Sequence, residues 1–183
     1  MARAESPHSS EAEIAAYRQA RSEPGTPGIL SPELAEFCQS GLALSLGVHD
    51  PQDGPVAGVG LAVLVLSSGR VRLMLRRGGH DRRLLALMRD NRVASTFTRP
   101  VTHRSVQLKG WDAVISAVRD DDIRAAALQA RMFERDLIES GYPSGFSTAF
   151  NVFDPAELVA VEFTPAAVFA QTPGPGAGTE LTA

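Results

Sequence analysis

The chain has 183 residues, of which 44% are hydrophobic, and it carries a formal net charge of −3 with one cysteine. This length and hydrophobic content suit a single domain with a substantial core. The slight acidic excess argues against a nucleic-acid-binding protein, because such proteins usually carry a basic excess that neutralises phosphates. Cys38 alone can form neither an intrachain disulfide nor a cysteine-pair zinc site.

No stretch of the chain approaches the roughly 20 apolar residues of a membrane span, and the N-terminal sequence MARAESPHSSEAEIAAY lacks the apolar run of a signal peptide. We therefore expect a cytoplasmic protein that binds neither membranes nor nucleic acid.

Composition divides the chain into three parts. Residues 1–28 contain the turn-forming sequence SEPGTPG and favour a flexible arm, although residues 11–21 also suit a helix. Residues 29–172 form the expected domain, and residues 173–183 form a Gly/Pro-rich tail.

Capping patterns and the helical spacing of apolar residues predict helices over residues 31–39, 81–91 and 121–140. Ser31 can accept hydrogen bonds from the first free amides of a helix, and Pro32 suits its first position. The longest helix begins after three aspartates, which favour the positive end of the helix dipole, and Gly141 ends it.

Alternating apolar and polar residues predict six or seven short strands. They cover residues 42–48, 59–66, 70–76, 93–98, 104–109, 158–163 and 167–171, with the sequence WDAVISAV continuing the sheet after Gly110. Many short strands with few helices predict a mainly β protein with flanking helices, built as a closed or partly split β-barrel.

Positive charge is concentrated in one segment of the chain. Ten of the 18 basic residues lie between Arg70 and Arg104, where only Asp81 and Asp90 oppose them. In the strand over residues 70–76, the arginines alternate with apolar residues, which predicts one core face and one cationic face. This segment suits an anionic ligand.

Several catalytic and metal-binding signatures are incomplete. Gly58 and Gly60 begin like a dinucleotide fingerprint, but the third glycine is missing and a strand follows where a helix is required. The four histidines show no helical pairing, so we expect no metal site. Ser144 in GYPSG lacks the strand and helix that flank a nucleophilic serine in hydrolases.

The run HDRRLLALMRDNRVASTF, followed by HRSVQLKG, resembles the core of the pyridoxamine 5'-phosphate oxidase-like proteins, the FMN-binding split barrels. In that family a basic pair opens a helix, a turn leads into a strand, and a later arginine-led strand ends at glycine. Arg82 and Arg83 match the basic pair, residues 90–91 the turn and residues 104–110 the later strand. The resemblance covers roughly residues 30–170.

The resemblance implies a homodimer that binds FMN at its interface. The phosphate would be held by basic residues of the third strand and the following helix, here Arg70, Arg72, Arg82 and Arg83. Physical chemistry agrees, because free amides at a helix start and planar guanidinium groups both bind phosphate well. The alternative is that these arginines form only a solvated face.

Three polar residues point to one face of the strand over residues 104–109. Ser105, Gln107 and Lys109 are spaced by two, and a flavin ring needs a few fixed donors and acceptors between apolar walls. The family position after the leading arginine often contacts the flavin. Ser105 occupies it where many relatives have glutamine, so either Gln107 takes over this contact or it is lost. The alternative is an exposed barrel face.

The chain also departs from its apparent relatives. True pyridoxamine phosphate oxidases end in a strand whose arginine and histidine hold the substrate phosphate, whereas this chain ends in FTPAAVFAQTPGPGAG. We therefore expect an FMN-dependent oxidoreductase with another small-molecule substrate or electron donor. The competing interpretation is a non-catalytic carrier or sensor of a flavin or a haem, with His49 or His103 as an axial haem ligand. A deazaflavin in place of FMN is a further alternative for the cofactor.

Overall fold

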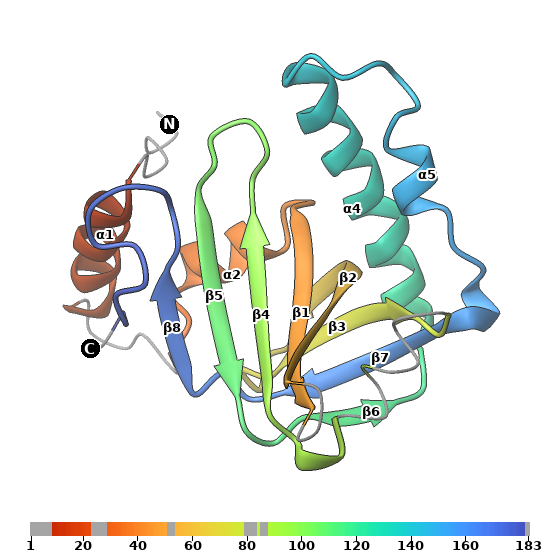
Figure 1. The fold of residues 1–183 in the computed structure, drawn as a ribbon, viewed down its shortest axis with the longest axis horizontal. Helices are drawn as coiled ribbons and strands as arrows, with labels where there is room; N and C mark the ends of the chain where they lie inside the picture. Colours follow the sequence, from red (N-terminus) through yellow and green to blue (C-terminus); the bar gives the residue numbers. More distant parts are fainter. Residues whose placement is uncertain (1–8, 23–28, 51–53, 79–83, 85–87, 182–183) are drawn as a thin grey trace.

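The computed structural model describes residues 9–22, 29–50, 54–78, 84 and 88–181, and it is a mainly β protein with flanking helices (Figure 1). One antiparallel sheet of eight strands has the order β6-β7-β3-β2-β1-β4-β5-β8. The strands are β1 (Ala43–Asp50), β2 (Gly54–Val65), β3 (Val71–Arg76), β4 (Val93–Thr98), β5 (Ser105–Gly110), β6 (Val114–Ser116), β7 (Leu158–Phe163) and β8 (Ala167–Ala170).

The sheet is open, because among the described residues its edge strands β6 and β8 do not pair with each other. The long strand β2 joins the two parts of the sheet: residues 54–59 pair with β1, and residues 60–65 pair with β3. The pairing register shifts between Gly60 and Ala62, where β2 passes from one part to the other. This architecture is consistent with a split barrel.

The strand number differs from the six or seven expected, because β6 is a strand of its own. The sequence predicts it only as a continuation of the preceding strand. It has three residues, and Val114 and Ile115 are both about half exposed, so it shows no alternation of buried and exposed positions. Its pairing with β7 across a long sequence separation defines it as a strand.

The main core lies between the inner faces of the strands. Apolar residues from most strands form it, and fully buried examples are Leu46, Leu73, Phe97, Leu108 and Val161. Strand β3 differs from its prediction, since residues 71–75 are all buried. Its second face is covered where Met74 and Ala62 pack against Ala125 and Ala126 of helix α4 (Asp120–Glu139). The face that the sequence predicts to be cationic is therefore covered at Arg72 and Met74.

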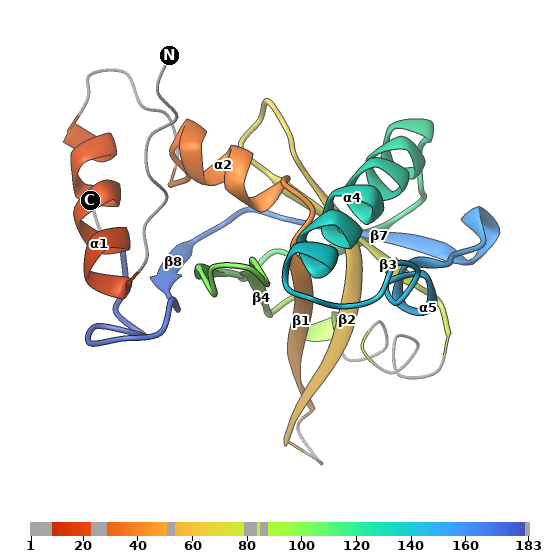
Figure 2. The ribbon, with the colours of Figure 1, turned by 90° about the horizontal axis from the view of Figure 1, so that it is seen from above.

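Helix α4 is held to the sheet by a side-chain amide. Gln129 Oε1 accepts a hydrogen bond from the Val63 amide at 3.0 Å, and Gln129 Nε2 donates to the Val63 carbonyl at 2.7 Å. The short helix α2 (Pro32–Cys38) begins as predicted, with Ser31 Oγ accepting from the Leu34 amide. In both views, α4 and α5 (Thr148–Asn151) lie on the opposite side of the molecule from α1 (Ser10–Ser22) and β8 (Figures 1 and 2).

Within residues 1–28 the structure describes residues 9–22, which form the helix that residues 11–21 also suit, and this helix, α1, packs against the domain. Glu13 is 1% exposed, and both of its carboxylate oxygens accept hydrogen bonds from the buried Arg104, at 2.7 and 2.8 Å. The chain beyond residue 172 also packs on the domain. The Leu181 amide donates to the Val168 carbonyl of β8, and the Leu181 side chain is buried.

The helix expected over residues 81–91 falls mostly outside the described residues. Within that range the structure describes a buried Leu84 and the 3-10 turn η1 (Met88–Asp90). A second 3-10 turn, η2 (Pro155–Glu157), precedes β7. None of the helices described is both long enough and apolar enough to cross a membrane.

Candidate functional site

A cavity of about 380 Å³ opens where the sheet meets the end of α4. This volume falls within the range of small-molecule sites. Its lining residues come from β1, β2, β4, α4, the following loop and α5, and they are Leu42, Ala43, Leu44, Ser45, Val59, Gly60, Leu61, Thr96, Thr98, Phe133, Leu137, Tyr142, Phe146 and Asn151.

Aromatic and aliphatic side chains form most of the cavity wall. Phe133 and Leu137 are one helical turn apart on α4, so both point to the same side. Tyr142 and Phe146 stack with ring centroids 4.8 Å apart, and they are 47% and 43% exposed. Gly141 has a φ of 91°, a conformation that glycine adopts without strain, and it turns the chain back after α4. The wall is therefore apolar, with an exposed aromatic pair.

Two threonines of β4 provide hydroxyl groups to the cavity. Thr98 Oγ1 and Ser105 Oγ are 2.8 Å apart, and Thr96 Oγ1 accepts a hydrogen bond from Gln107 Nε2 at 3.0 Å. These bonds join residues directly opposite each other in the β4–β5 pairing. A hydroxyl that accepts one bond still has its own proton, so Thr96 can donate to a ligand.

Two of the three residues predicted on β5, Ser105 and Gln107, thus lie next to the cavity without lining it. Ser105 and Gln107 contact the lining threonines and fix the positions of their hydroxyls. Lys109 lies further along the strand, with Nζ 4.2 Å from the centroid of the Phe169 ring on β8. Lys109 is not among the described residues that line the cavity.

Asn151 supplies a polar group without a partner. Its side-chain nitrogen Nδ2 is buried, and nothing in the described parts of the chain accepts a hydrogen bond from it. A buried N–H group left unpaired costs about 1–3 kcal/mol, so such groups normally have a partner. Because Asn151 also lines the cavity, a ligand with an acceptor atom there would satisfy it.

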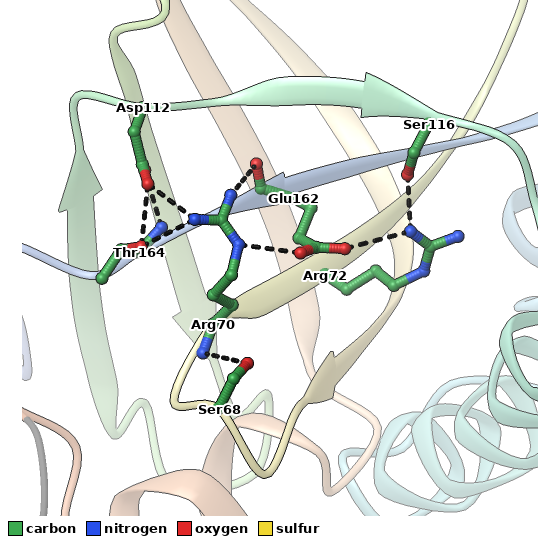
Figure 3. Close-up of polar contacts among 7 residues, drawn as sticks. All are labelled: Ser68, Arg70, Arg72, Asp112, Ser116, Glu162 and Thr164. Carbon is green, nitrogen blue, oxygen red and sulfur yellow. Dashed lines mark hydrogen bonds and ion pairs between the residues drawn. The ribbon is translucent and has the colours of Figure 1, made fainter.

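The two predicted phosphate-binding arginines of the third strand lie away from this cavity, in an internal network (Figure 3). Arg70, just before β3, pairs with Asp112 and Glu162, each at 2.7 Å. Arg72 is 1% exposed at its side chain and pairs with Asp122 at 2.7 Å and with Glu162 at 3.3 Å.

All five N–H donors of Arg72 are used within the chain. Nε and one hydrogen of Nη2 bond to Asp122, the other hydrogen of Nη2 bonds to the Ala117 carbonyl, and Nη1 bonds to Ser116 and Glu162. This buried guanidinium group offers no further donor to a phosphate.

About half of the charge concentration seen in the sequence is paired with acids in the described part of the chain. Of the ten arginines between Arg70 and Arg104, five pair with acids of the described chain: Arg70, Arg72, Arg92, Arg99 and Arg104. Most of these acids lie far away in the sequence, so the local pattern gives no sign of them. The predicted ligands Arg82 and Arg83 lie outside the described residues.

Sequence reasoning missed the aromatic pair and Asn151. The signal for the pair is the sequence GYPSGF, in which two glycines enclose a turn that carries Tyr142 and ends next to Phe146. Asn151 gives no such signal, because its position in the cavity depends on how α5 packs. In the described part of the chain, no three His, Cys, Asp or Glu side chains are grouped so that they could hold a metal ion.

No protein-family model matches the chain, and no curated protein matches it. Similar solved structures include an F420 reductase, with 14% identity, a TM-score of 0.46, and coverage of 73% of this chain and 93% of the other. HupZ of Group A Streptococcus has 11% identity and a TM-score of 0.48, and the match covers 81% of this chain and 99% of HupZ. A pyridoxamine 5'-phosphate oxidase-related, FMN-binding protein from Nostoc punctiforme has 15% identity, a TM-score of 0.44, and coverage of 80% and 87%. These neighbours include the class that the sequence resembles.

Proposed function

We propose that the protein is an FMN-binding flavoprotein, and that the flavin ring occupies the cavity between the sheet and α4. The observation that carries this proposal is the unpartnered Nδ2 of Asn151 in an otherwise largely apolar cavity. A flavin ring has apolar faces and an edge rich in hydrogen-bond acceptors and donors. It therefore suits the apolar wall, the Asn151 amide and the Thr96 hydroxyl together.

When bound, the flavin would supply hydride transfer. The residues of the chain would bind and orient it. Phe133 and Leu137 would exclude water from the ring faces, while Asn151 and Thr96 would fix its polar edge. Gln107 would hold Thr96 in place through their 3.0 Å hydrogen bond. We propose an oxidoreductase, with a non-catalytic flavin carrier as the alternative.

For the phosphate group, we propose Arg82 and Arg83 as the ligands, on the basis of the sequence resemblance. Arg72 uses all its donors internally, and Arg70 is paired with two acids. A haem is less well supported than a flavin, because neither His49 nor His103 belongs to the residues that line the cavity.

The visible absorption spectrum of the purified protein, followed by mass analysis of any released ligand, tests this proposal. We expect flavin absorption bands and a released mass equal to that of FMN. A released mass equal to that of a deazaflavin would change the identity of the cofactor but leave its proposed binding site unchanged. A haem Soret band, or a colourless protein to which neither FMN nor riboflavin binds, would overturn the proposal.

Two variants separate the ring site from the phosphate site. Asn151→Leu removes a ring contact, so it should weaken riboflavin and FMN binding by about the same factor, roughly ten-fold for one hydrogen bond to a buried group. Arg83→Ala removes a phosphate contact, so it should weaken FMN binding roughly ten- to hundred-fold and leave riboflavin unchanged. Arg89→Ala is the control for loss of a positive charge, because Arg89 lies six residues after Arg83 and is not part of the basic pair. Equal behaviour of Arg83→Ala and Arg89→Ala would contradict the phosphate assignment.

We also propose that the protein is a homodimer. Ala43, Ser45, Ala57 and Val59 lie on the outer face of β1 and β2, and all four are exposed, Val59 to 54%. An exposed sheet face with small and apolar side chains suits a second sheet. Ala43, Ser45 and Val59 also line the cavity, so a two-fold dimer that covered this face would also cover that part of the cavity wall.

A further inference from the structure

We propose that the outer face of helix α4 is a docking surface for an acidic amphipathic helix of a partner protein. This face is a single stripe along the helix, which we call the α4 stripe. Its residues are Arg124, Leu128, Arg131, Arg135 and Ile138, and all five are exposed. None of them lines the cavity, so this surface is independent of the proposed flavin site.

The α4 stripe has the spacing of a helix-packing seam. Its members follow one another by four, three, four and three residues, which keeps them on one side of a helix with 3.6 residues per turn. The same alternation places the seam residues of coiled coils against a partner helix. The other side of α4 is already occupied, since Ala125 and Ala126 pack on the sheet and Gln129 bonds to Val63. In both views α4 lies at the outside of the molecule (Figures 1 and 2).

The two aliphatic members of the stripe provide apolar area for a partner. Leu128 is 53% exposed and Ile138 is 47% exposed. They lie about 15 Å apart along the helix axis, at 1.5 Å per residue. The arginine stems between them extend the apolar surface, because the methylene groups of arginine pack on apolar neighbours while the charged group stays in water. A helix lying along the stripe would bury both aliphatic side chains at once.

The charge of the stripe is not compensated in its middle. Arg124 pairs with Asp121, but Arg131 and Arg135 form no ion pair with any acid in the described part of the chain. These two arginines are four residues apart, and like charges at this spacing destabilise a helix. Glutamate or aspartate on a partner would remove this repulsion and form charge-assisted hydrogen bonds with both guanidinium groups. The stripe therefore favours an acidic partner.

A second copy of the chain does not fit this face. Arg131 is the middle residue of the stripe, so an antiparallel pair of α4 helices would bring its two copies together. A parallel pair would place every arginine of the stripe against its own copy. Facing like charges are unfavourable at an interface, so the charge pattern selects a different protein.

The same pattern disfavours a membrane or a nucleic acid. Helices that bind membranes bury a continuous apolar face, whereas here the arginines lie in the same stripe as the two aliphatic residues. Exposed acids, Asp120 and Asp121 at one end of α4 and Glu139 at the other, limit the positive charge to a short segment. A phosphate backbone needs a longer basic track, while a short acidic helix matches this length.

Calorimetric titration of the full-length chain with a synthetic helical peptide as long as α4 tests the proposal. The peptide carries leucines at the positions that face Leu128 and Ile138, and glutamates at those that face Arg131 and Arg135. We expect a dissociation constant of micromolar order, and at least about ten-fold weaker binding of a peptide with the same composition in scrambled order. No binding, or equal binding of the two peptides, would overturn the proposal.

Charge reversal provides matched variants. The double substitution Arg131→Glu with Arg135→Glu should weaken binding of the acidic peptide by at least about ten-fold, and it should allow binding of a peptide in which lysines replace the facing glutamates. Arg18→Glu with Arg92→Glu is the control, because both arginines are exposed outside the stripe. Equal weakening in both double variants, or no binding of the lysine peptide to the first, would contradict pairing across the stripe.

Two further measurements distinguish the other occupants. Light scattering should give the wild type and the Arg131→Glu, Arg135→Glu variant the same mass, and a lower mass for the variant would assign the face to contacts between copies of the chain. Sedimentation with phosphatidylserine vesicles should leave the protein in solution. Vesicle binding that this variant abolishes would assign the face to a membrane. Either result would overturn the proposal.

Discussion

Arg72 connects four parts of the chain through one buried guanidinium group. It starts from β3 and contacts Glu162 on β7, Ser116 on β6 and Asp122 at the start of α4. Asp122 also accepts a hydrogen bond from the Arg119 amide at 2.7 Å, which caps α4. The cavity wall on α4 therefore depends on a charged contact near the other end of the helix.

Replacing Arg72 with methionine should reduce the free energy of unfolding by about 3–5 kcal/mol, because Asp122 would remain buried without its partner. Arg92→Met is the control, since Arg92 is 63% exposed and pairs with Asp90 at the surface, where such pairs contribute about 0–1 kcal/mol. Chemical denaturation measures both. Equal small losses would show that the Arg72 network does not stabilise the fold.

Two buried aspartates have pKa values displaced in opposite directions. Burial alone would raise the pKa of Asp122, but hydrogen bonds from Arg72 and from the Arg119 amide hold it below its usual 3.8. Burial raises the pKa of Asp136, and the nearby Arg99 only partly offsets this effect. Ionised Asp122 thus favours the folded state, whereas ionisation of Asp136 disfavours it.

These shifts predict opposite pH dependences. The stability from Asp122 is present above about pH 4 and is lost as the pH falls through its lowered folded pKa. The stability associated with protonated Asp136 is present below about pH 4 and is lost as the pH rises through its raised folded pKa. At pH 7, Asp122→Asn should therefore lower the free energy of unfolding, and Asp136→Asn should leave it unchanged or raise it. Denaturation at several pH values checks this. A similar loss in both variants would contradict the assignment.

At the level of elements, local patterns predicted the bounds of strands with different burial, both β4, which alternates between buried and partly exposed residues, and β7, which is buried at nearly every position. The bounds of β4 and β7 agree with the sequence to the residue, and α4 begins and ends within one residue of its prediction. The environment of β3 could not be predicted this way, because its second face is covered by residues some 50 to 90 positions later. Likewise, the spacing of Ser105 and Gln107 indicated a polar face, whereas Asn151 joins the site only through packing of α5.

At Gly110, the last residue of β5, neighbouring core atoms lie too close to leave room for a side chain. A Cβ atom there would lie 2.3 Å from Phe163 Cδ2 and 2.9 Å from the Thr164 carbonyl oxygen. Gly110→Ala should lower the free energy of unfolding by about 1–3 kcal/mol. Gly47→Ala is the matched strand control, because its Cβ would be 3.7 Å from the nearest atom, the Ala94 carbonyl oxygen. Thermal denaturation would contradict this account if both variants lost the same stability.

At the level of the whole molecule, the open sheet and the exposed outer face of β1 and β2 predict assembly. Light scattering at micromolar concentration should give twice the chain mass of 19.5 kDa. The same measurement on the cofactor-free chain shows whether the dimer needs the cofactor. A mass of about 19.5 kDa in both states would reject the homodimer.

The central claim is that the cavity beside α4 holds the flavin ring, and a cavity-filling variant tests it most directly. Ala43 is exposed and lines the cavity, so Ala43→Phe should fill it without disturbing the core. Ala127→Phe is the control, since Ala127 is exposed on α4 away from the lining residues. Calorimetric titration with FMN should show at least about ten-fold weaker binding to Ala43→Phe and unchanged binding to Ala127→Phe. Wild-type affinity in both variants would contradict the claim.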